Sequence, residues 1–577
     1  MDCRRHSWIT LVVLCLAGSR VGAQATAERT VDPCDGRIIT RIDIRPGRPP
    51  FSGHAAKWRA VARALGLHHA TTRPRVIAAF LALHVGDPCT EFRRAETERV
   101  LRAQPFLADA RVRIVADTAG GDLTAIVETT DEIPVLVGGR FRGIGPTALS
   151  LGNGNVAGQG LLIQGAWEAA RGFHMGFGGR ITDYATFNRP YVLNLEAFRF
   201  RIGDALAVEL GHPFFTDLQR VSWHAGIEGS TTYPGFARPA LDNLALEVRQ
   251  RSWDLSGVLR VFGTRTIALL GGAVTGRRVD PASFGVIVTD SGFLADTGVV
   301  LRNRYLPFET VRVGGIAGAR RVSYVAVSGF DALTGAQDAP SGVSGAVYLA
   351  RGFATGPGEL SDVFLSGATY AGYARRTFLI GNLAEVEGRR DMLTRDWNSI
   401  IGSTRSALYW GQGPGTVLVV SDEYSAGVNS VLPLQLTFGD PTGGVIGYHR
   451  TGLAGSRRNV VRTELRQSWA SALRGADLGV ALFGQVGTLW SGDAPYGWTG
   501  SRGSVGLSLL GAYPTRSKRV YHIDLGFPLT RGGVGGGRFE IRFGSDDRTS
   551  RFWEEPADVA QARTGANPAT LFAWPTR

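Results

Sequence analysis

Long apolar runs are missing from this chain of 577 residues. Beyond the N-terminal segment, no stretch reaches the roughly 18 consecutive apolar residues that indicate a membrane-spanning helix. The mean hydropathy is close to zero. A helical membrane protein is therefore excluded, and a soluble globule or a β-barrel remains.

Lysine and methionine are scarce. Lys57 and Lys518 are the only lysines, so arginine supplies almost all of the 63 basic residues and dominates the net charge of +13. Glycine, at 78 residues, is far above its usual share of about 7%. Few helix formers and many glycines predict a β-rich chain. Genome base composition is one interpretation of the arginine excess, and pairing with lipid phosphates or lining a polar lumen is the other.

Catalytic motifs are also absent from the sequence. There is no Walker loop, no His-Glu-x-x-His motif and no cysteine pair at zinc-binding spacing. The glycine clusters at 411–415 and 532–537 precede no helical pattern, so we interpret them as hairpin turns. We therefore expect no enzyme activity, no cofactor and no metal.

The first 25 residues have the three parts of a cleavable export signal. Arg4 and Arg5 come first, an apolar run follows at 8–17, and small residues occupy 21–25. A retained anchor is the alternative, but the apolar run is far shorter than the roughly 20 residues of a spanning helix. We predict that the mature chain is exported, which makes nucleic acid an unexpected partner.

Cysteine is rare, with 4 in the whole chain. Cys3 and Cys15 fall in the export signal, and Leu14 stands where a lipoprotein signal would need a small residue. Cys34 and Cys89 remain in the exported chain, where an oxidising compartment favours a disulfide. We predict that they are bonded, with two separate thiols as the alternative.

Two regions differ in pattern, with the change near residues 131–139. Apolar residues alternate or recur at helical spacing in the first region, giving a strand, two helices and two strands at 38–45, 75–83, 91–104, 110–115 and 123–128. The helix at 91–104 has one apolar face, which predicts packing against a small sheet. We expect a small α+β domain.

From about residue 148 to residue 543 the apolar period is two, interrupted by glycine-rich turns. Ile541 and Phe543, for example, alternate with Glu540 and Arg542. A soluble sandwich is one interpretation, but some 400 residues without a break exceed its usual size. We predict an all-β transmembrane barrel with apolar residues outside and charges in the lumen.

Four segments of the first region, at 72–77, 85–88, 101–106 and 109–112, and two of the second, at 151–160 and 212–215, carry a resemblance to a known family. They resemble the superfamily of outer-membrane assembly factors that includes BamA and TamA, in which periplasmic POTRA domains precede a bacterial surface antigen barrel. The first four segments resemble a POTRA domain, residues 151–160 resemble the entry to the barrel, and residues 212–215 resemble a turn-region motif. The family implies a barrel of 16 antiparallel strands and a POTRA fold in the order β-α-α-β-β.

The patterns and the resemblance together divide the chain into five parts. We expect a signal peptide at 1–25, a linker at 26–36, a POTRA-like periplasmic domain at 37–133, an outer-membrane barrel at 134–545 and a C-terminal tail at 546–577. One POTRA-like segment is present where such factors commonly have several.

Residues 444–448 and 461–466 resemble the family's long loop that folds into the barrel, together with the strand after it. The candidate residues of this lumen loop are Val445, Ile446, Gly447, Tyr448, Glu464 and Arg466. The family usually carries an arginine where this chain has Ile446, so the usual ion pair between loop and wall cannot form there. Arg450, Arg457 and Arg458 are the candidate substitutes.

The resemblance implies insertion, assembly or translocation of other outer-membrane proteins in a Gram-negative cell. A client strand would add to a backbone edge of the POTRA sheet or of the barrel seam. The candidate seam residues are Gly152, Gly154, Gly158, Phe539, Ile541 and Phe543. Ordinary turn glycines are an equal interpretation of the first three.

The expected partners are the outer-membrane bilayer, client proteins and periplasmic proteins that bind the POTRA domain. Two other functions remain open at this point. One is a passive pore or lipid-handling barrel without insertase activity, favoured by Ile446 and the single POTRA-like segment. The other is a structural or adhesive surface barrel.

Overall fold

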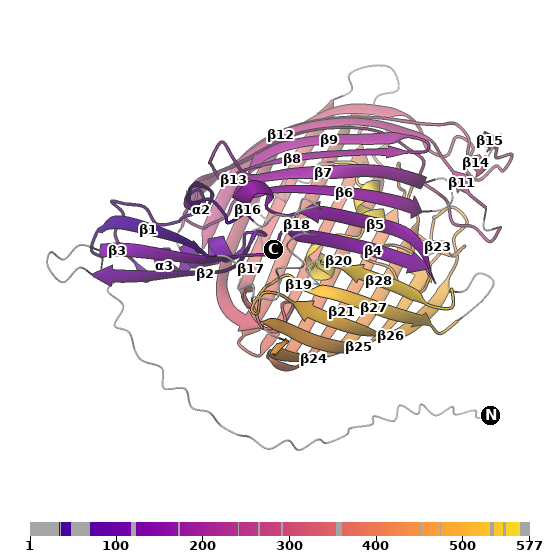
Figure 1. Ribbon diagram of the computed structural model, residues 1–577. Helices are drawn as coiled ribbons and strands as arrows, with labels where there is room; N and C mark the ends of the chain where they lie inside the picture. Colours follow the sequence, from indigo (N-terminus) through magenta and orange to yellow (C-terminus); the bar gives the residue numbers. More distant parts are fainter. Residues whose placement is uncertain are drawn as a thin grey trace, which may run out of the picture.

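The computed structural model describes residues 34, 36–47, 70–116, 123–142, 144–170, 174–240, 242–263, 266–289, 292–353, 361–448, 452–473, 475–530, 536–545 and 550–565. The predicted export signal lies outside these residues. A large closed barrel carries a small module at one end (Figure 1).

The barrel consists of 20 strands that pair antiparallel in chain order, and the last strand pairs with the first. Its strands are β4 (Val135–Arg142), β5 (Gly145–Asn153), β6 (Leu161–Ala170), β7 (His174–Thr186), β8 (Tyr191–Phe200), β9 (Asp204–His212), β10 (Val221–Thr232), β12 (Val248–Phe262), β13 (Ile267–Pro281), β16 (Phe308–Ser328), β17 (Ala336–Phe353), β18 (Asp362–Arg375), β19 (Phe378–Asp391), β20 (Trp397–Gly411), β21 (Gly415–Val428), β24 (Arg457–Leu473), β25 (Ala476–Trp490), β26 (Gly500–Ala512), β27 (Tyr521–Pro528) and β28 (Glu540–Gly544).

The predicted count of 16 strands is therefore wrong. That number came from the family resemblance and not from the residues. An alternating pattern assigns side chains to two faces, but it is the same for any number of strands. The sequence therefore could not fix the size of the barrel.

Strand β24 shows how the alternation places its side chains. Arg458, Arg462 and Arg466 are buried, whereas Val461 and Leu465 are exposed on the opposite face. Successive side chains of a strand point to opposite faces. The charged residues therefore face the lumen and the aliphatic residues face outward.

The module at one end of the barrel contains β1 (Ile39–Gly47), α2 (Pro74–Ala78), α3 (Glu91–Arg102), β2 (Leu107–Ala116) and β3 (Leu123–Asp131). Its sheet has the order β1-β3-β2. Thr90 caps α3 by accepting a hydrogen bond from the backbone N–H of Arg93 at 3.3 Å. Cys34 is bonded to Cys89, with their Cα atoms 4.9 Å apart.

The predicted POTRA-like α+β domain is wrong. The described residues of this segment form only a three-stranded sheet with one five-residue and one twelve-residue helix. Its apolar core is shared with the barrel, because Ala185 and Phe215 pack into it. Local periodicity shows which residues are buried, but it does not show whether the core that they join is their own.

Two further small sheets lie in connections at the barrel end opposite the module. β11 (Leu244–Ala245), β14 (Val286–Thr289) and β15 (Gly292–Ala295) form one of them, and β22 (Leu436–Thr437) pairs with β23 (Ala454–Gly455) in the other. The short 3-10 helix η2 (Val156–Gly158) lies at the module end.

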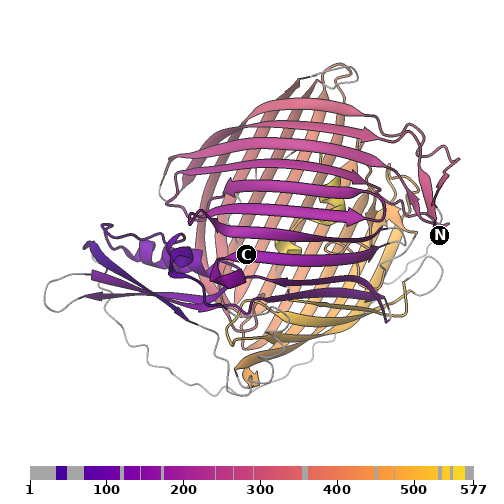
Figure 2. The same cartoon turned by 45° about the horizontal axis from the view of Figure 1, so that its top comes forward.

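The C-terminal tail turns back into the barrel. Its helices α4 (Ser550–Trp553) and α5 (Ala557–Ala562) are the yellow elements inside the ring of strands in Figure 2. No helix among the described residues is long and apolar enough to cross a membrane.

Candidate functional site at the barrel seam and lumen

Charged side chains are buried inside this barrel, and large apolar side chains are exposed on its outer face. The largest fully buried side chains include Arg312, Arg389, Arg405 and Arg458. Large exposed apolar side chains occur on strands around the barrel, among them Leu149, Phe177, Ile227, Leu255, Val313, Leu349, Ile380, Leu465, Leu482, Leu507 and Ile523. An apolar outer face of this extent marks a surface that meets a membrane or another protein.

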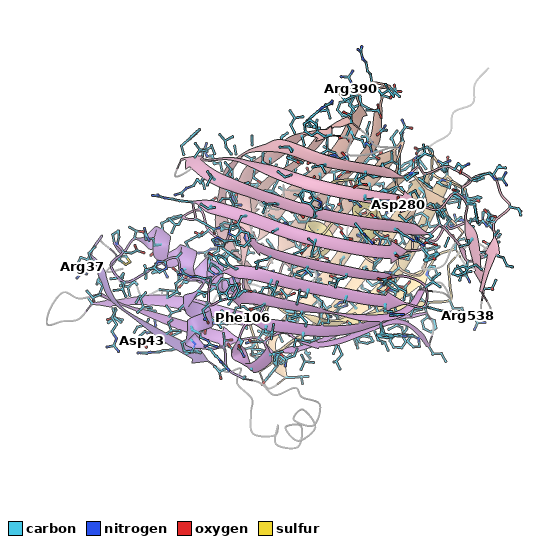
Figure 3. All side chains as sticks on the ribbon, turned by 90° about the horizontal axis from the view of Figure 1, so that it is seen from above. Arg37, Asp43, Phe106, Asp280, Arg390 and Arg538 are labelled. Carbon is cyan, nitrogen blue, oxygen red and sulfur yellow. A yellow bond between two sulfur atoms is a disulfide. The ribbon has the colours of Figure 1, made fainter. Side chains whose placement is uncertain are left out.

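The two ends of the barrel are easily distinguished in Figure 3. Arg37 and Asp43 mark the module, and Asp280 and Arg538 lie at the opposite end, with Phe106 where the module meets the barrel. The lumen loop, between β21 and β24, starts from the end opposite the module.

The seam is the pairing of β28 with β4, seen in Figure 1 where gold meets purple. It comprises five residue pairs, against 18 between β16 and β17. Beyond β28, the backbone N–H of Ser545 donates to the carbonyl of Val137 at 2.8 Å. The barrel is thus closed by one of its shortest strand pairings.

Aromatic packing covers the outer side of the seam. The rings of Phe141 and Phe543 lie 5.7 Å apart. A Cβ atom on Gly139 would lie 2.3 Å from the ring of Phe543, so only glycine fits beneath that ring. Gly139 was not among the predicted seam residues, although the Gly138-Gly139 pair inside an apolar segment was a usable signal.

The structure brings two of the six predicted seam residues to the seam. Ile541 and Phe543 lie on β28, and Phe539 lies just before it. Gly152 lies one strand away, on β5 between β4 and β6. Gly154 donates its N–H to the carbonyl of Pro134 at 2.6 Å, beside the start of β4.

Gly158 serves the module instead of the seam. Its φ is +69°, and a Cβ there would lie 2.1 Å from the carbonyl oxygen of Thr71. Its own carbonyl accepts the N–H of Arg73 at 2.9 Å. Glycine is required here because the module approaches the turn after β5 so closely.

The predicted loop residues 445–448 lie inside the barrel and touch the seam strand. Val445, Ile446 and Tyr448 are buried. The N–H of Gly447 donates to Oε2 of Glu540 on β28 at 2.7 Å. The Tyr448 hydroxyl donates to the carbonyl of Gly503 at 2.9 Å.

Ile446 makes an apolar contact where the family would place an arginine. It packs over Gly526 on β27, where a Cβ would lie 2.2 Å from its Cγ2. The charged group lies on the wall and not on the loop. Arg462 of the wall donates to the loop carbonyls of Gly444 at 2.7 Å and Thr442 at 2.9 Å. The wall therefore holds the loop by its backbone.

Of the three candidate substitutes for the missing arginine, only Arg458 is seen to contact the loop. Arg458 donates to the carbonyl of Thr437 at 2.7 Å, so it does hold the base of the loop. Arg457 is exposed, and Arg450 lies outside the described residues.

Glu464 and Arg466 do not join residues 445–448. Both are buried on β24, and Nε of Arg466 lies 2.7 Å from Oε1 of Glu464. Arg466 also donates to the carbonyl of Phe330, in the turn between β16 and β17 at the module end. These two residues link the wall to that turn.

The tail is held by ion pairs and hydrogen bonds to the part of the wall that runs from β16 to β24. Arg458 contacts both Asp558 of α5, at 2.5 Å, and Glu423 of β21, at 3.2 Å. Arg563 lies 3.3 Å from Glu387. The carbonyl of Thr564 accepts a hydrogen bond from Arg312 at 2.9 Å.

Burial in the lumen changes the acidity of the tail. It raises the pKa of Asp558 to about 7, and Asp440 and Glu423 act in the same direction while Arg458 acts against them. The carboxyl group is therefore partly protonated near neutral pH. The sequence analysis left the role of the tail open, although its closely spaced acidic residues and Arg563 were a signal of internal ion pairing.

A cavity of about 330 Å³ remains between the seam, the loop and the tail. Its lining includes Arg140, Glu168, Arg462, Asp524, Arg542 and Phe552. Among the described residues, no group of three or more His, Cys, Asp or Glu side chains is placed to hold a metal ion.

The module is fixed to the barrel mouth through α3. Arg99 lies 4.4 Å from the ring centre of Tyr324 and donates to the carbonyl of Phe215 at 2.5 Å. Burial opposes the ionisation of Glu96, but Arg99 and a hydrogen bond from Thr216 outweigh it and lower the pKa of Glu96. This buried ion pair and the shared apolar core orient the module on the barrel.

Neither the protein families nor the curated proteins that were searched match this sequence. Among solved structures, the chain is similar to BamA from Haemophilus ducreyi lacking POTRA domains 1-3, at 11% identity over 87% of this chain and 84% of that chain, with a TM-score of 0.33. It is also similar to CdiB from Escherichia coli, at 10% identity over 88% and 76% of the two chains, with a TM-score of 0.42. CdiB from Acinetobacter baumannii matches at 10% identity over 88% and 73%, with a TM-score of 0.36.

Proposed function

We propose that this chain is a bacterial outer-membrane barrel of the BamA and TamA type that helps other outer-membrane proteins to insert, assemble or cross. The client would pair with the edges of β28 and β4 when the seam opens. The observation that carries the proposal is the short seam, where the last strand β28 pairs with β4 over five residues, as it does with β27, against 18 between β16 and β17. No enzymatic step is part of the proposal.

A membrane location is supported by the distribution of side chains. In water, an outer face rich in exposed Leu, Ile, Val and Phe would drive aggregation, whereas in a bilayer it is solvated by lipid. The arginines and carboxylates of the lumen would then be shielded from the acyl chains. The predicted export signal adds to this argument.

Strand addition at the seam is supported by the cost of an unpaired edge. In lipid each unsatisfied backbone group costs several kcal/mol, so an open seam is a high-energy template that a client strand would relieve. Opening β28 from β4 disrupts five pairs, as does opening it from β27, whereas opening β16 from β17 disrupts 18. The two edges of β28 are therefore among the least costly places to open.

A passive pore is the second candidate, and the remaining cavity of about 330 Å³ is the observation that favours it. The lumen loop and the tail oppose it, because both are tied to the wall by buried hydrogen bonds and ion pairs. The proposed barrel would conduct little until these contacts break.

Locking the seam tests the proposal. Phe141 and Ile541 are directly opposite on the outer face, so cysteines at both positions can form a disulfide across the seam. Leu465→Cys with Leu482→Cys is the matched control, because this outward-facing pair joins β24 to β25. The readout is insertion of an unfolded small outer-membrane barrel into vesicles that contain each variant.

We expect the oxidised seam pair to abolish client insertion, reductant to restore it, and the control pair to leave it unchanged. Undiminished insertion through a locked seam would defeat the proposed mechanism.

A further inference from the structure

Two arginines face each other across the seam. Arg542 of β28 is directly opposite Arg140 of β4 in the strand register. Both side chains line the same lumen cavity. Like charges directly opposite on neighbouring strands destabilise the pairing.

No carboxylate stands between these arginines in their row of side chains across the barrel wall. Following the register from β6 to β27, the row reads Glu168, Ala148, Arg140, Arg542 and Asp524. Within this row, each arginine has an acidic residue only on the side away from the seam. The row leaves two adjacent positive charges where the barrel closes.

The two guanidinium groups differ in what already holds them. Arg542 donates to Oε1 of Glu540 at 2.7 Å and to the carbonyl of Pro441 at 3.1 Å, which fixes its position in the lumen. The guanidinium of Arg140 has no hydrogen bond or ion pair with any residue that the structure describes. Nε of the nearby Arg462 is also buried without a partner in the described part of the chain.

We propose that this cavity binds a small oxyanion of the phosphate type between Arg140 and Arg542, and that the bound ion holds the seam closed. Guanidinium groups bind phosphate oxygens with paired, charge-assisted hydrogen bonds. A cavity of about 330 Å³ has ample room for such an ion and several water molecules. An anion between the arginines turns their repulsion into two attractions that cross the seam.

Most of the acidic residues around the cavity already have other partners, so they leave the two arginines available to an anion. Asp524 lies 3.0 Å from Nδ1 of His522, and Glu464 is paired with Arg466. Two acidic residues compete with an anion for the arginines: Glu540, which is held by Arg542 and by the N–H of Gly447 and also acts on Arg140, and Glu168, which is exposed and lies two strands from Arg140. Neutralising Glu168 should therefore strengthen anion binding, whereas neutralising Arg140 should abolish it.

The inference does not depend on the proposed insertase activity, and its test needs no client. The purified full-length protein in detergent is titrated with inorganic phosphate at constant ionic strength, with chloride and acetate as the other arms. Binding is measured by calorimetry, and amide hydrogen exchange is followed in residues 540–544. We expect phosphate to slow this exchange while leaving β17 unchanged.

Three variants separate binding from misfolding. Arg140→Gln should weaken phosphate binding by at least about tenfold, as expected for the loss of a charge-assisted contact. Without phosphate, its seam should exchange more slowly than in the parent chain, because the repulsion is gone; a misfolded variant would do the opposite. Glu168→Gln should bind phosphate more tightly. Arg351→Gln is the control, because Arg351 contacts Ser361 and does not line the cavity.

Two results would overturn the inference. One is unchanged phosphate affinity in Arg140→Gln. The other is seam protection by acetate or chloride equal to that by phosphate, which would leave only a general effect of salt.

Discussion

The wall that binds the tail and the seam that closes the barrel differ in the length of their strand pairing and in the partners of their buried arginines. On the tail wall, strands pair over 10 to 18 residues, as in β17 with β18 and β16 with β17, and each buried arginine named there has a carboxylate beside it. At the seam five residues pair, and arginine faces arginine. Stability is thus concentrated away from the strand edges that would have to separate.

The seam is not left without support. The loop reaches it through Gly447 and Glu540, and Ser545 extends it by a hydrogen bond to Val137. These contacts come from the loop and from the chain just past β28, so they can be released without unfolding the wall. We infer that the state of the seam depends on what occupies the lumen.

The largest effect is expected from Arg458→Ala on the tail wall. Arg458 is fully buried and pairs with Glu423 and Asp558, so its removal leaves Asp558 without its cation and Glu423 with only Arg462, 4.0 Å away. Breaking a buried pair in this way costs about 3–5 kcal/mol. The measurement is the free energy of unfolding in detergent.

Arg113→Ala is the matched control for that variant, because Arg113 pairs with Glu128 on the exposed surface of the module. An exposed pair contributes about 0–1 kcal/mol. Equal losses in the two variants would remove the contrast between lumen and surface.

A smaller effect is expected from Gly139→Val at the seam. The added side chain would overlap the ring of Phe543, and overpacking of this kind costs about 1–3 kcal/mol. Gly315→Val on β16 is the control, since nothing lies within 4 Å of a Cβ there. Thermal unfolding followed by circular dichroism compares them, and Phe543→Ala should rescue Gly139→Val but not a variant that is misfolded elsewhere.

The smallest effect is a pH dependence of tail docking. The folded pKa of Asp558, about 7, lies above its ordinary value of 3.8, so docking is favoured fully below about 4 and weakens as pH rises through 7. Arg458, Glu423 and Asp440 are the charged groups around it. Conductance of single barrels in planar bilayers should therefore rise between pH 5 and pH 8.

Asp558→Asn should remove this dependence, because the amide does not titrate. A conductance that rises equally with pH in Asp558→Asn would show that another group is responsible.

Sequence reasoning anticipated local features better than distant ones. The alternation of Ile541 and Phe543 with Arg542 correctly separated the outer face from the lumen, because a side chain's face is set by its immediate neighbours. It could not show that Arg542 faces Arg140, since that pairing joins the first and last strands of the barrel, about 400 residues apart in the sequence. Gly152 was predicted at the seam because it lies near the first strand in the sequence, but it lies on β5, one strand away from the seam.

The lumen was predicted only in part. Residues 445–448 are buried as a folded-in loop would be, but the resemblance to a family suggested an ion pair made by a loop arginine. In the structure the arginine is on the wall instead of the loop, and Arg462 donates to loop carbonyls. Every residue has a backbone carbonyl, so the sequence does not show which carbonyls accept hydrogen bonds from the wall.

Hydrogen exchange of the protein in a lipid bilayer tests the central contrast most directly. If the seam is the weak closure of an otherwise robust barrel, the amides of residues 540–544 will exchange well before those of β16 and β17. Equal protection of these strands would contradict the account, because no preferred opening would then exist for a client strand to enter.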